Sequence, residues 1–202
     1  MSNSISEILL SIGAVKINTD EKFTWASGIL SPIYCDNRKI IGFPEKRAQM
    51  VEAFVASIKE HFPEVEVIAG TATAGIPHAA FIAQEMMLPM VYVRGEKKAH
   101  GAGKQIEGCE VDGKKTVVIE DLLSTGGSSL KAVNALKESG AEVLGVSAIF
   151  SYELQKLKDS FGAKSLEYYT LTNLDELLEE SKKSNAISKE QVEVVKAFRD
   201  SL

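Results

Sequence analysis

The residues with the clearest chemical pattern lie between Thr116 and Ser129, in the segment TVVIEDLLSTGGSS. Two adjacent carboxylates, Glu120 and Asp121, follow a run of β-branched residues that is typical of a buried strand. At the end of a strand, such a pair can accept hydrogen bonds from a vicinal diol or hold a hydrated Mg²⁺ ion. The small residues that follow let backbone N–H groups approach an anion, and a helix N-terminus adds partial positive charge. A diol site and a phosphate site joined by one loop predict recognition of a ribose 5-phosphate.

Two other interpretations of this segment stay open. It can be a tight strand-to-helix connection with no ligand, or the acidic strand of a nucleoside triphosphatase. The second alternative is weakened because the chain has no GxxxxGK[ST] loop, which such enzymes use to cradle phosphates.

A second candidate is the cationic segment RGEKKAHGAG, from Arg94 to Gly103. Arg94, Lys97, Lys98 and His100 stand among glycine and alanine, directly after an apolar run. A loop of this charge could close over a pyrophosphate group and shield it from water. The alternative is an ordinary solvated surface loop.

The elements that must position these residues alternate between strands and helices. Apolar runs predict strands over residues 65–69, 90–93, 116–119 and 143–150, and residues 14–36 suggest short strands and turns. Helical periodicity predicts helices over residues 5–12, 44–61, 77–87, 128–139, 174–182 and 189–199. Residues 94–112 have no periodicity. The order predicts an α/β fold with a central, mainly parallel sheet flanked by helices, which binds ligands beyond the carboxyl ends of its strands.

The composition is that of an ordinary globular chain. Of the 202 residues, 45% are hydrophobic and 25% are charged, and the net charge is −5. This charge gives no support to nucleic-acid binding, so an anionic ligand needs a local cluster of cations. The two cysteines, Cys35 and Cys109, form no CxxC pair, which argues against a disulfide scaffold or a cysteine zinc site. The N-terminus has no leader pattern and no apolar run is long enough for a bilayer, so we expect a cytoplasmic protein without a membrane partner.

The segment TVVIEDLLSTGGSS resembles the phosphoribosyl pyrophosphate (PRPP) motif of type I phosphoribosyltransferases. The resemblance implies that Glu120 and Asp121 contact the ribose hydroxyls and that the following loop wraps the 5-phosphate. It also implies the fold of that family, as one domain over residues 1–202 with a small N-terminal hood lobe over about residues 1–40. The PRPP-binding residues implied in this way are Arg94, Lys98, His100, Glu120, Asp121, Leu122, Leu123, Ser124, Thr125, Gly126, Gly127 and Ser128.

Within that family, two segments resemble orotate phosphoribosyltransferases. Arg94, Lys98, His100 and Gly101 match the catalytic loop R-x-x-x-K-x-H-G in register, and FTWASGILSPIY matches the lobe that covers the pyrimidine. The resemblance implies Arg94, Lys98 and His100 as catalytic residues, with Lys98 foremost.

The resemblance also implies an orotate contact, a metal and an assembly. Ser124 is the residue implied for orotate, and Mg²⁺ is expected to bind mainly through PRPP and pyrophosphate rather than through a protein metal site. In the family, the loop reaches into the neighbouring subunit, so a homodimer is implied.

Three family features are absent from this chain. Ala26 stands where several members carry an orotate-contacting lysine. The segment AGTATAGIPHAA, from Ala69 to Ala80, corresponds to the pyrophosphate loop but lacks the lysine that some relatives have at Thr73 or Ala74. No arginine follows the predicted strand 143–150, where relatives pair one with the orotate carboxylate. His78 lies in the first turn of the helix predicted after this loop, and we interpret it as structural.

The implied reaction transfers the 5-phosphoribosyl group of PRPP to orotate, giving orotidine 5′-phosphate and pyrophosphate, a step of UMP biosynthesis. Two alternatives remain at this stage. One is a PRPP-dependent transferase for a purine or for uracil. The other is a regulator of the same fold that binds a nucleotide without turnover.

Overall fold

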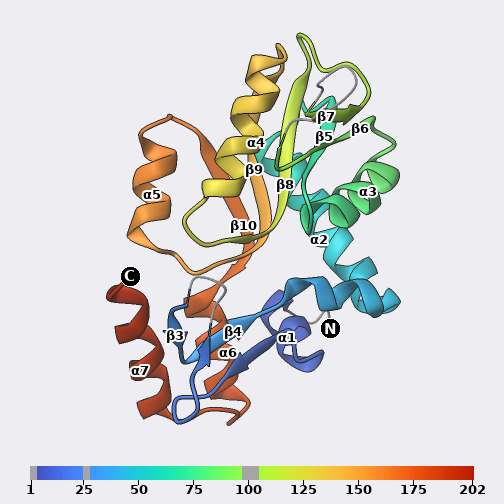
Figure 1. Ribbon diagram of the computed structural model, residues 1–202. Coiled ribbons are helices and arrows are strands. Elements are labelled where there is room, and N and C mark those ends of the chain that lie inside the picture. Colours follow the sequence, from blue (N-terminus) through green and yellow to red (C-terminus); the bar gives the residue numbers. More distant parts are fainter. Residues whose placement is uncertain (1–3, 25–27, 97–104) are drawn as a thin grey trace.

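The computed structural model describes residues 4–24, 28–96 and 105–202. Its larger part, at the top of Figure 1, is a six-stranded sheet that lies between helices. The predicted α/β class is confirmed. No helix among these described residues is long and apolar enough to cross a membrane. The strands of the sheet are β5 (Val67–Thr71), β6 (Met90–Val93), β7 (Ile106–Gly108), β8 (Lys115–Leu123), β9 (Glu142–Ser151) and β10 (Glu167–Asn173).

The sheet has the order β10-β9-β8-β5-β6-β7, and all neighbouring pairs are parallel except β6 and β7. Two of these strands were not predicted. β7 is a short antiparallel edge strand inside the aperiodic region 94–112, and β10 is only partly buried, which weakens its apolar pattern. The helix α5 (Gln155–Gly162) was missed as well, because only Leu157 and Phe161 of its eight residues are buried.

Alternating strand residues supply the two faces of the sheet. Ile68, Val117 and Ile119 pack against helices α2 (Pro44–His61) and α3 (Gly75–Met86). Val67 and Val118 point to the other face and join the core under α4 (Gly127–Glu138) and α5. The sheet is therefore buried on both sides, as expected for parallel strands.

The smaller part, at the bottom of Figure 1, is built from both ends of the chain. A hydrogen bond of 2.6 Å joins the hydroxyls of Ser6 and Thr172, and Gln191 approaches Thr19 at 3.4 Å. The sequence had indicated only residues 1–40 for this lobe. Its elements are α1 (Ile5–Ser11), β1 (Val15–Ile17), β2 (Phe23–Thr24), β3 (Leu30–Ser31), β4 (Ile33–Cys35), the 3₁₀ helix η1 (Asn37–Gly42), α6 (Leu174–Lys183) and α7 (Lys189–Asp200).

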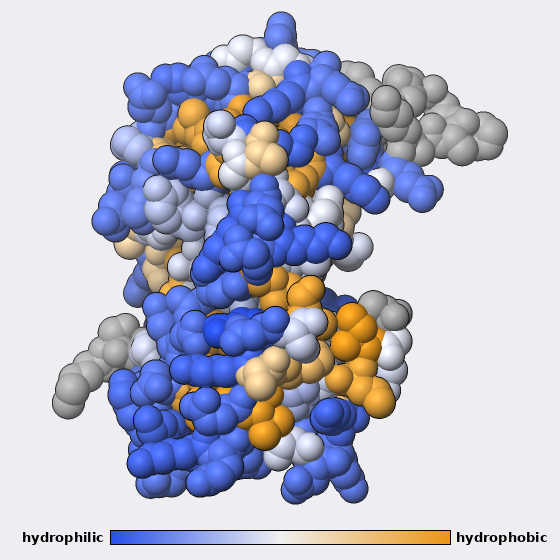
Figure 2. Space-filling view, turned by 90° about the vertical axis from the view of Figure 1, so that its left-hand side faces the viewer, coloured by the Kyte–Doolittle hydropathy of each residue, from blue (hydrophilic) through white to orange (hydrophobic). Residues whose placement is uncertain are grey.

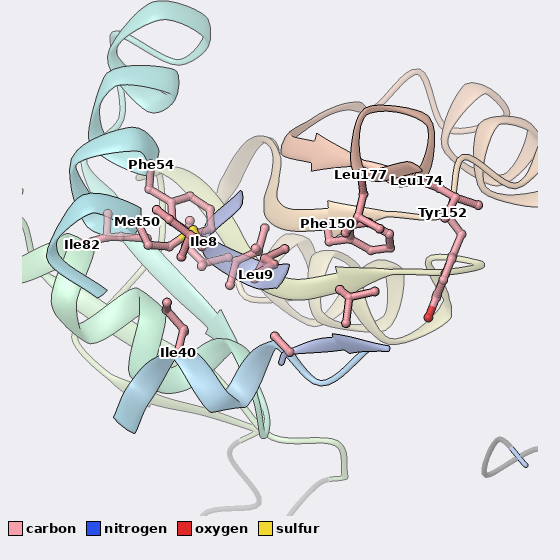
Figure 3. Packing of buried hydrophobic residues seen from close by; sticks show 14 of the residues in the cluster. Ile8, Leu9, Ile40, Met50, Phe54, Ile82, Phe150, Tyr152, Leu174 and Leu177 are labelled. Carbon is pink, nitrogen blue, oxygen red and sulfur yellow. The ribbon is translucent and has the colours of Figure 1, made fainter. Parts of the chain in front are cut away.

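One hydrophobic core runs from the sheet into this lobe. Ile8 and Leu9 of α1 lie beside Phe54 of α2, and Leu174 and Leu177 of α6 belong to the same cluster (Figure 3). All five side chains are at most 1% exposed. In the space-filling view, the outline is indented between the two parts, and hydrophobic side chains come to the surface beside the indentation (Figure 2). The shared core holds the lobe in a fixed position beside the carboxyl ends of the strands.

Candidate active site

The paired acids lie where strand β8 loses one of its neighbours. Pairing between β5 and β8 ends at Gly70 and Ile119, whereas β9 stays paired with β8 as far as Leu123. The sequence had placed Glu120 and Asp121 after a strand ending at Ile119. They are in fact within the strand, which continues along β9. From Glu120 onward β8 has no β5 neighbour, and such an edge, at the carboxyl ends of the strands, is where parallel α/β sheets bind ligands.

Glu120 is fixed by the first turn of α4. It is 4% exposed, and its Oε2 accepts hydrogen bonds of 3.2 Å from the hydroxyls of both Ser128 and Ser129. Its Oε1 accepts from the backbone N–H of Asp121 at 3.1 Å. The residues predicted for the diol and those predicted for the phosphate are therefore brought together by direct contact.

Burial raises the pKa of Glu120 above its ordinary value, and the negative charge of Asp121 raises it further. Burial also raises the pKa of Asp121, although a hydrogen bond with Glu120 and the positive charge of Arg38 oppose that rise. Two neighbouring carboxyl groups away from water resist carrying two charges at once. A polyhydroxyl ligand or a cation would favour the ionised pair.

The loop from Ser124 to Gly126 connects β8 to α4 in three residues. Gly126 has φ +78°, and a Cβ at this position would lie 2.6 Å from the Phe161 ring, so only glycine fits. Leu123 is fully buried in the core under α4, and Leu122 packs against the other core. These two leucines, predicted to bind PRPP, can therefore offer only backbone groups.

The segment after β5 faces the acids across the open edge. Gly75 begins α3, and a Cβ there would meet the Ile119 carbonyl oxygen at 2.3 Å. This contact holds the turn of residues 72–74 close to the acidic part of β8. His78, in the same helix, is 1% exposed and lies near the Phe54 ring, so it belongs to the core as the sequence suggested.

Arg94 follows β6 at the same end of the sheet. Its backbone N–H donates to the Gln105 carbonyl, and the Gln105 side chain donates back to the Arg94 carbonyl, both at 2.9 Å. Its guanidinium lies 3.8 Å from Glu107. Of the other cations predicted in this segment, Lys97, Lys98 and His100 lie outside the described residues, as does Ala26.

Asn37 is a site residue that the sequence analysis missed. Its amide donates a 2.7 Å hydrogen bond to the Asp121 carbonyl oxygen, and its Oδ1 accepts one of 3.1 Å from the Cys35 thiol. Burial raises the pKa of that thiol, so it stays protonated and can donate. The polar run Cys35 to Arg38 was visible in the sequence, but nothing local indicated its partner on β8.

The donor set near the open edge suits a magnesium ion that arrives with its ligand. Glu120 and Asp121 offer carboxylate oxygens, which Mg²⁺ prefers, and Mg²⁺ commonly binds through one or two carboxylates together with substrate phosphates. Among the described residues, no cluster of three or more His, Cys, Asp or Glu side chains could hold a metal ion by itself.

Comparison with known proteins identifies relatives over the whole chain. The family model of the phosphoribosyl transferase domain matches residues 44–173. The chain is 54% identical over 202 residues to the orotate phosphoribosyltransferase of Staphylococcus aureus strain Mu50, covering 100% of both proteins. It is 52% identical over 200 residues to the enzyme of that name from Lactococcus lactis subsp. cremoris strain SK11, covering 99% of this chain and 96% of the relative. Among solved structures, orotate phosphoribosyltransferase from Aeropyrum pernix matches with a TM-score of 0.78 and 26% identity, over 87% of this chain and 97% of that chain.

Proposed function

The chain belongs to the type I phosphoribosyltransferase family and is an orotate phosphoribosyltransferase, and from this premise we propose how its residues divide the work. Glu120 and Asp121 bind the ribose hydroxyls of PRPP, and the backbone from Leu122 to Ser128 binds the 5-phosphate. The observation that carries this assignment is the pair of hydrogen bonds from Ser128 and Ser129 to Glu120. They join the diol site to the helix N-terminus that attracts the phosphate.

The reaction forms a bond between N1 of orotate and C1′ of PRPP, and N1 gives up its proton, for which the departing pyrophosphate is an acceptor. The C1′–oxygen bond to pyrophosphate breaks, and its electron pair leaves with the pyrophosphate. Catalysis of this kind needs positioning and stabilisation of the departing charge, with no protein nucleophile. The acids on β8 and the loop from Ser124 to Gly126 would hold the ribose at two points, so that C1′ is presented at the open edge of β8 beyond Ile119.

The pyrophosphate side is assigned to Arg94, Lys98 and His100. Arg94 is anchored to the edge strand through Gln105, which supports its role at the start of this loop. Mg²⁺ bound to PRPP, next to Glu120 and Asp121, would neutralise part of the negative charge on the leaving group. The cations of the loop would neutralise the rest as the bond to C1′ breaks.

The base side is assigned to the hood lobe and to Ser124. Ser124 directly follows β8, and residues 33–35 of β4 lie close to the acids through the contact of Asn37 with Asp121. The hydroxyl of Ser124 would contact orotate. The last residue of β9, Ser151, and the two residues after it, Tyr152 and Glu153, include no arginine, and the Glu153 carboxylate forms an ion pair with Lys158 at 3.2 Å.

The enzyme is also proposed to be a homodimer in which the loop of residues 94–103 completes the site of the partner subunit. The support is the match of Arg94, Lys98 and His100 to the catalytic loop of the family. A cytoplasmic location stays a prediction from the sequence.

One assay tests the substrate and separates the alternatives. The protein is incubated with PRPP, Mg²⁺ and one base at a time, and the loss of orotate absorbance is compared with turnover of uracil and purines. Turnover of orotate alone is expected. Turnover of another base in place of orotate would contradict the choice of substrate. No turnover with any base would favour a nucleotide-binding regulator.

A further inference from the structure

A cavity of about 320 Å³ lies between the first turns of α4 and the carboxyl ends of β5 and β6. One wall belongs to the phosphate loop and its helix, and the other to the pyrophosphate loop and the start of the cationic segment. Thr71, Ala72, Arg94, Gly127, Ser128 and Lys131 are among the residues that line it. The cavity therefore joins the two regions to which the phosphates of PRPP are assigned.

Thr71 supplies a buried polar group to this cavity. Thr71 is the last residue of β5, and it is 4% exposed. Its Oγ1 has no hydrogen-bond partner among the described residues. A buried hydroxyl without a partner is destabilising, so an unpaired group beside a cavity indicates a ligand that completes its hydrogen bonding.

Lys131 supplies a positive charge on the opposite wall. It lies three residues after Ser128 and four after Gly127, so all three line one face of α4. Within the described part of the chain, no carboxylate forms an ion pair with its ammonium group. By contrast, Arg94 on the facing wall already has Glu107 at 3.8 Å. The charge of Lys131 is thus available to an anion in the cavity, at the end of the helix where anions are favoured.

We propose that Lys131 is a pyrophosphate-binding residue, which together with Arg94 and the Thr71 hydroxyl holds the diphosphate of PRPP. The inference rests on the proposed division of the PRPP site. The turn of residues 71–74 carries no lysine. Lys131 brings an equivalent charge to the same cavity from α4 instead. The diphosphate is favoured over the 5-phosphate because Thr71, Ala72 and Arg94, which face Lys131, belong to the pyrophosphate side.

The test compares Lys131→Gln with Lys137→Gln, an exposed lysine in the last turn of the same helix. Binding of inorganic pyrophosphate, PRPP and ribose 5-phosphate is measured by calorimetry in the presence of Mg²⁺. For Lys131→Gln, we expect binding of pyrophosphate and PRPP to weaken about tenfold, which is about 1.4 kcal/mol. Binding of ribose 5-phosphate should stay within twofold of the unmodified protein. Lys131→Arg should restore most of the loss, and Thr71→Val should weaken pyrophosphate binding without changing ribose 5-phosphate binding.

Two results would overturn the assignment. If binding of ribose 5-phosphate weakened as much as binding of pyrophosphate, Lys131 would belong to the 5-phosphate site. If binding of all three ligands were unchanged, Lys131 would have no role in binding them. Because pyrophosphate binding is measured without orotate, the outcome is independent of the base that the enzyme uses. If the unmodified protein failed to turn over orotate, that result would contradict the choice of orotate as substrate. It would not contradict the assignment of Lys131 to pyrophosphate.

Discussion

The side-chain amide of Asn37 donates a 2.7 Å hydrogen bond to the carbonyl oxygen of Asp121, which lies 84 positions later in the chain. Asn37 is 1% exposed, and its other amide atom is satisfied by the Cys35 thiol. The contact ties the hood lobe to the strand segment that presents the acids. It holds the backbone of Asp121, while the first turn of α4 holds the side chain of Glu120.

Replacing Asn37 by alanine should loosen this attachment. The partly buried Asp121 carbonyl would lose its partner, at a cost of about 1 kcal/mol or more. We expect a several-fold rise in the KM for PRPP and a lower melting temperature, measured by steady-state kinetics and thermal unfolding. Asn134→Ala is the control, because Asn134 is exposed on α4 and should change neither quantity. An unchanged KM in Asn37→Ala would show that the contact does not position the diol site.

The raised pKa values of Glu120 and Asp121 predict that PRPP binds more tightly as the pH rises. In the proposed site, the ionised pair accepts hydrogen bonds from the ribose, whereas the protonated pair cannot do so at both groups. Binding at neutral pH should therefore release protons, detected by calorimetry in buffers of different ionisation enthalpy. Glu120→Gln should bind PRPP weakly and release fewer protons than the unmodified protein.

The raised pKa of Glu120 also affects the stability of the fold. Because the folded pKa of Glu120 lies above the unfolded value, the free protein loses stability as the pH rises from the unfolded value through the folded one. Glu120→Gln should thus gain melting temperature relative to the unmodified protein, and the gain should grow with pH. A constant difference across the pH range would argue against a raised pKa.

Gly75→Ala should destabilise the fold. The added Cβ would stand 2.3 Å from the Ile119 carbonyl, and a backbone atom cannot move aside as a side chain can. We expect a loss of more than about 2 kcal/mol in the free energy of unfolding, measured with urea. Gly162→Ala is the matched control, because its Cβ would have nothing within 4 Å and Gly162 ends a helix. Similar stability of the two variants would disprove the tight contact between α3 and β8.

Lys98→Ala should lower kcat far more than it weakens PRPP binding, because the loop is proposed to act mainly on the departing charge. Single-turnover kinetics measure the chemical step directly, and an unchanged rate of this step would contradict the role of Lys98.

Co-expression of the Lys98→Ala chain with an Asp121→Asn chain tests whether the site is shared between subunits. If the loop acts on the partner subunit, each mixed dimer holds one intact site, and roughly a quarter of the activity should return. No recovery in isolated mixed dimers would mean that the loop serves its own subunit.

His78 predicts a loss of stability in acid. Burial lowers its pKa from 6.5 to about 4, so the folded protein binds this proton less readily than the unfolded chain. Its contribution is complete above the unfolded pKa and is lost as the pH falls from about 6.5 towards 4, by up to roughly 3 kcal/mol. Urea unfolding at several pH values should show this slope, and His78→Asn should reduce it. An identical slope in the variant would assign the acid sensitivity to other groups.

Much of the sheet was predictable because apolar runs and helical periodicity are local properties. The helix over residues 44–61 and the strand over residues 90–93 were predicted with the bounds that α2 and β6 have. The edge strand β7 was not, since three residues with no buried side chain leave no pattern. The end of β8 was placed too early because Glu120 and Asp121 interrupt an apolar run, although backbone pairing with β9 continues past them.

The sequence by itself was enough to predict the proposed chemistry of the site, because the acids, the predicted phosphate loop and the helix N-terminus are contiguous between Glu120 and Ser129. A motif whose residues all lie within ten positions can be recognised from the order of its residues alone. Only the tertiary structure decided which distant residues complete the site. Asn37 reaches Asp121 because the hood packs on the sheet, and Thr71 faces Lys131 because β5 lies between β8 and β6. The order of strands in a sheet depends on how all the elements pack together, and no local pattern records it.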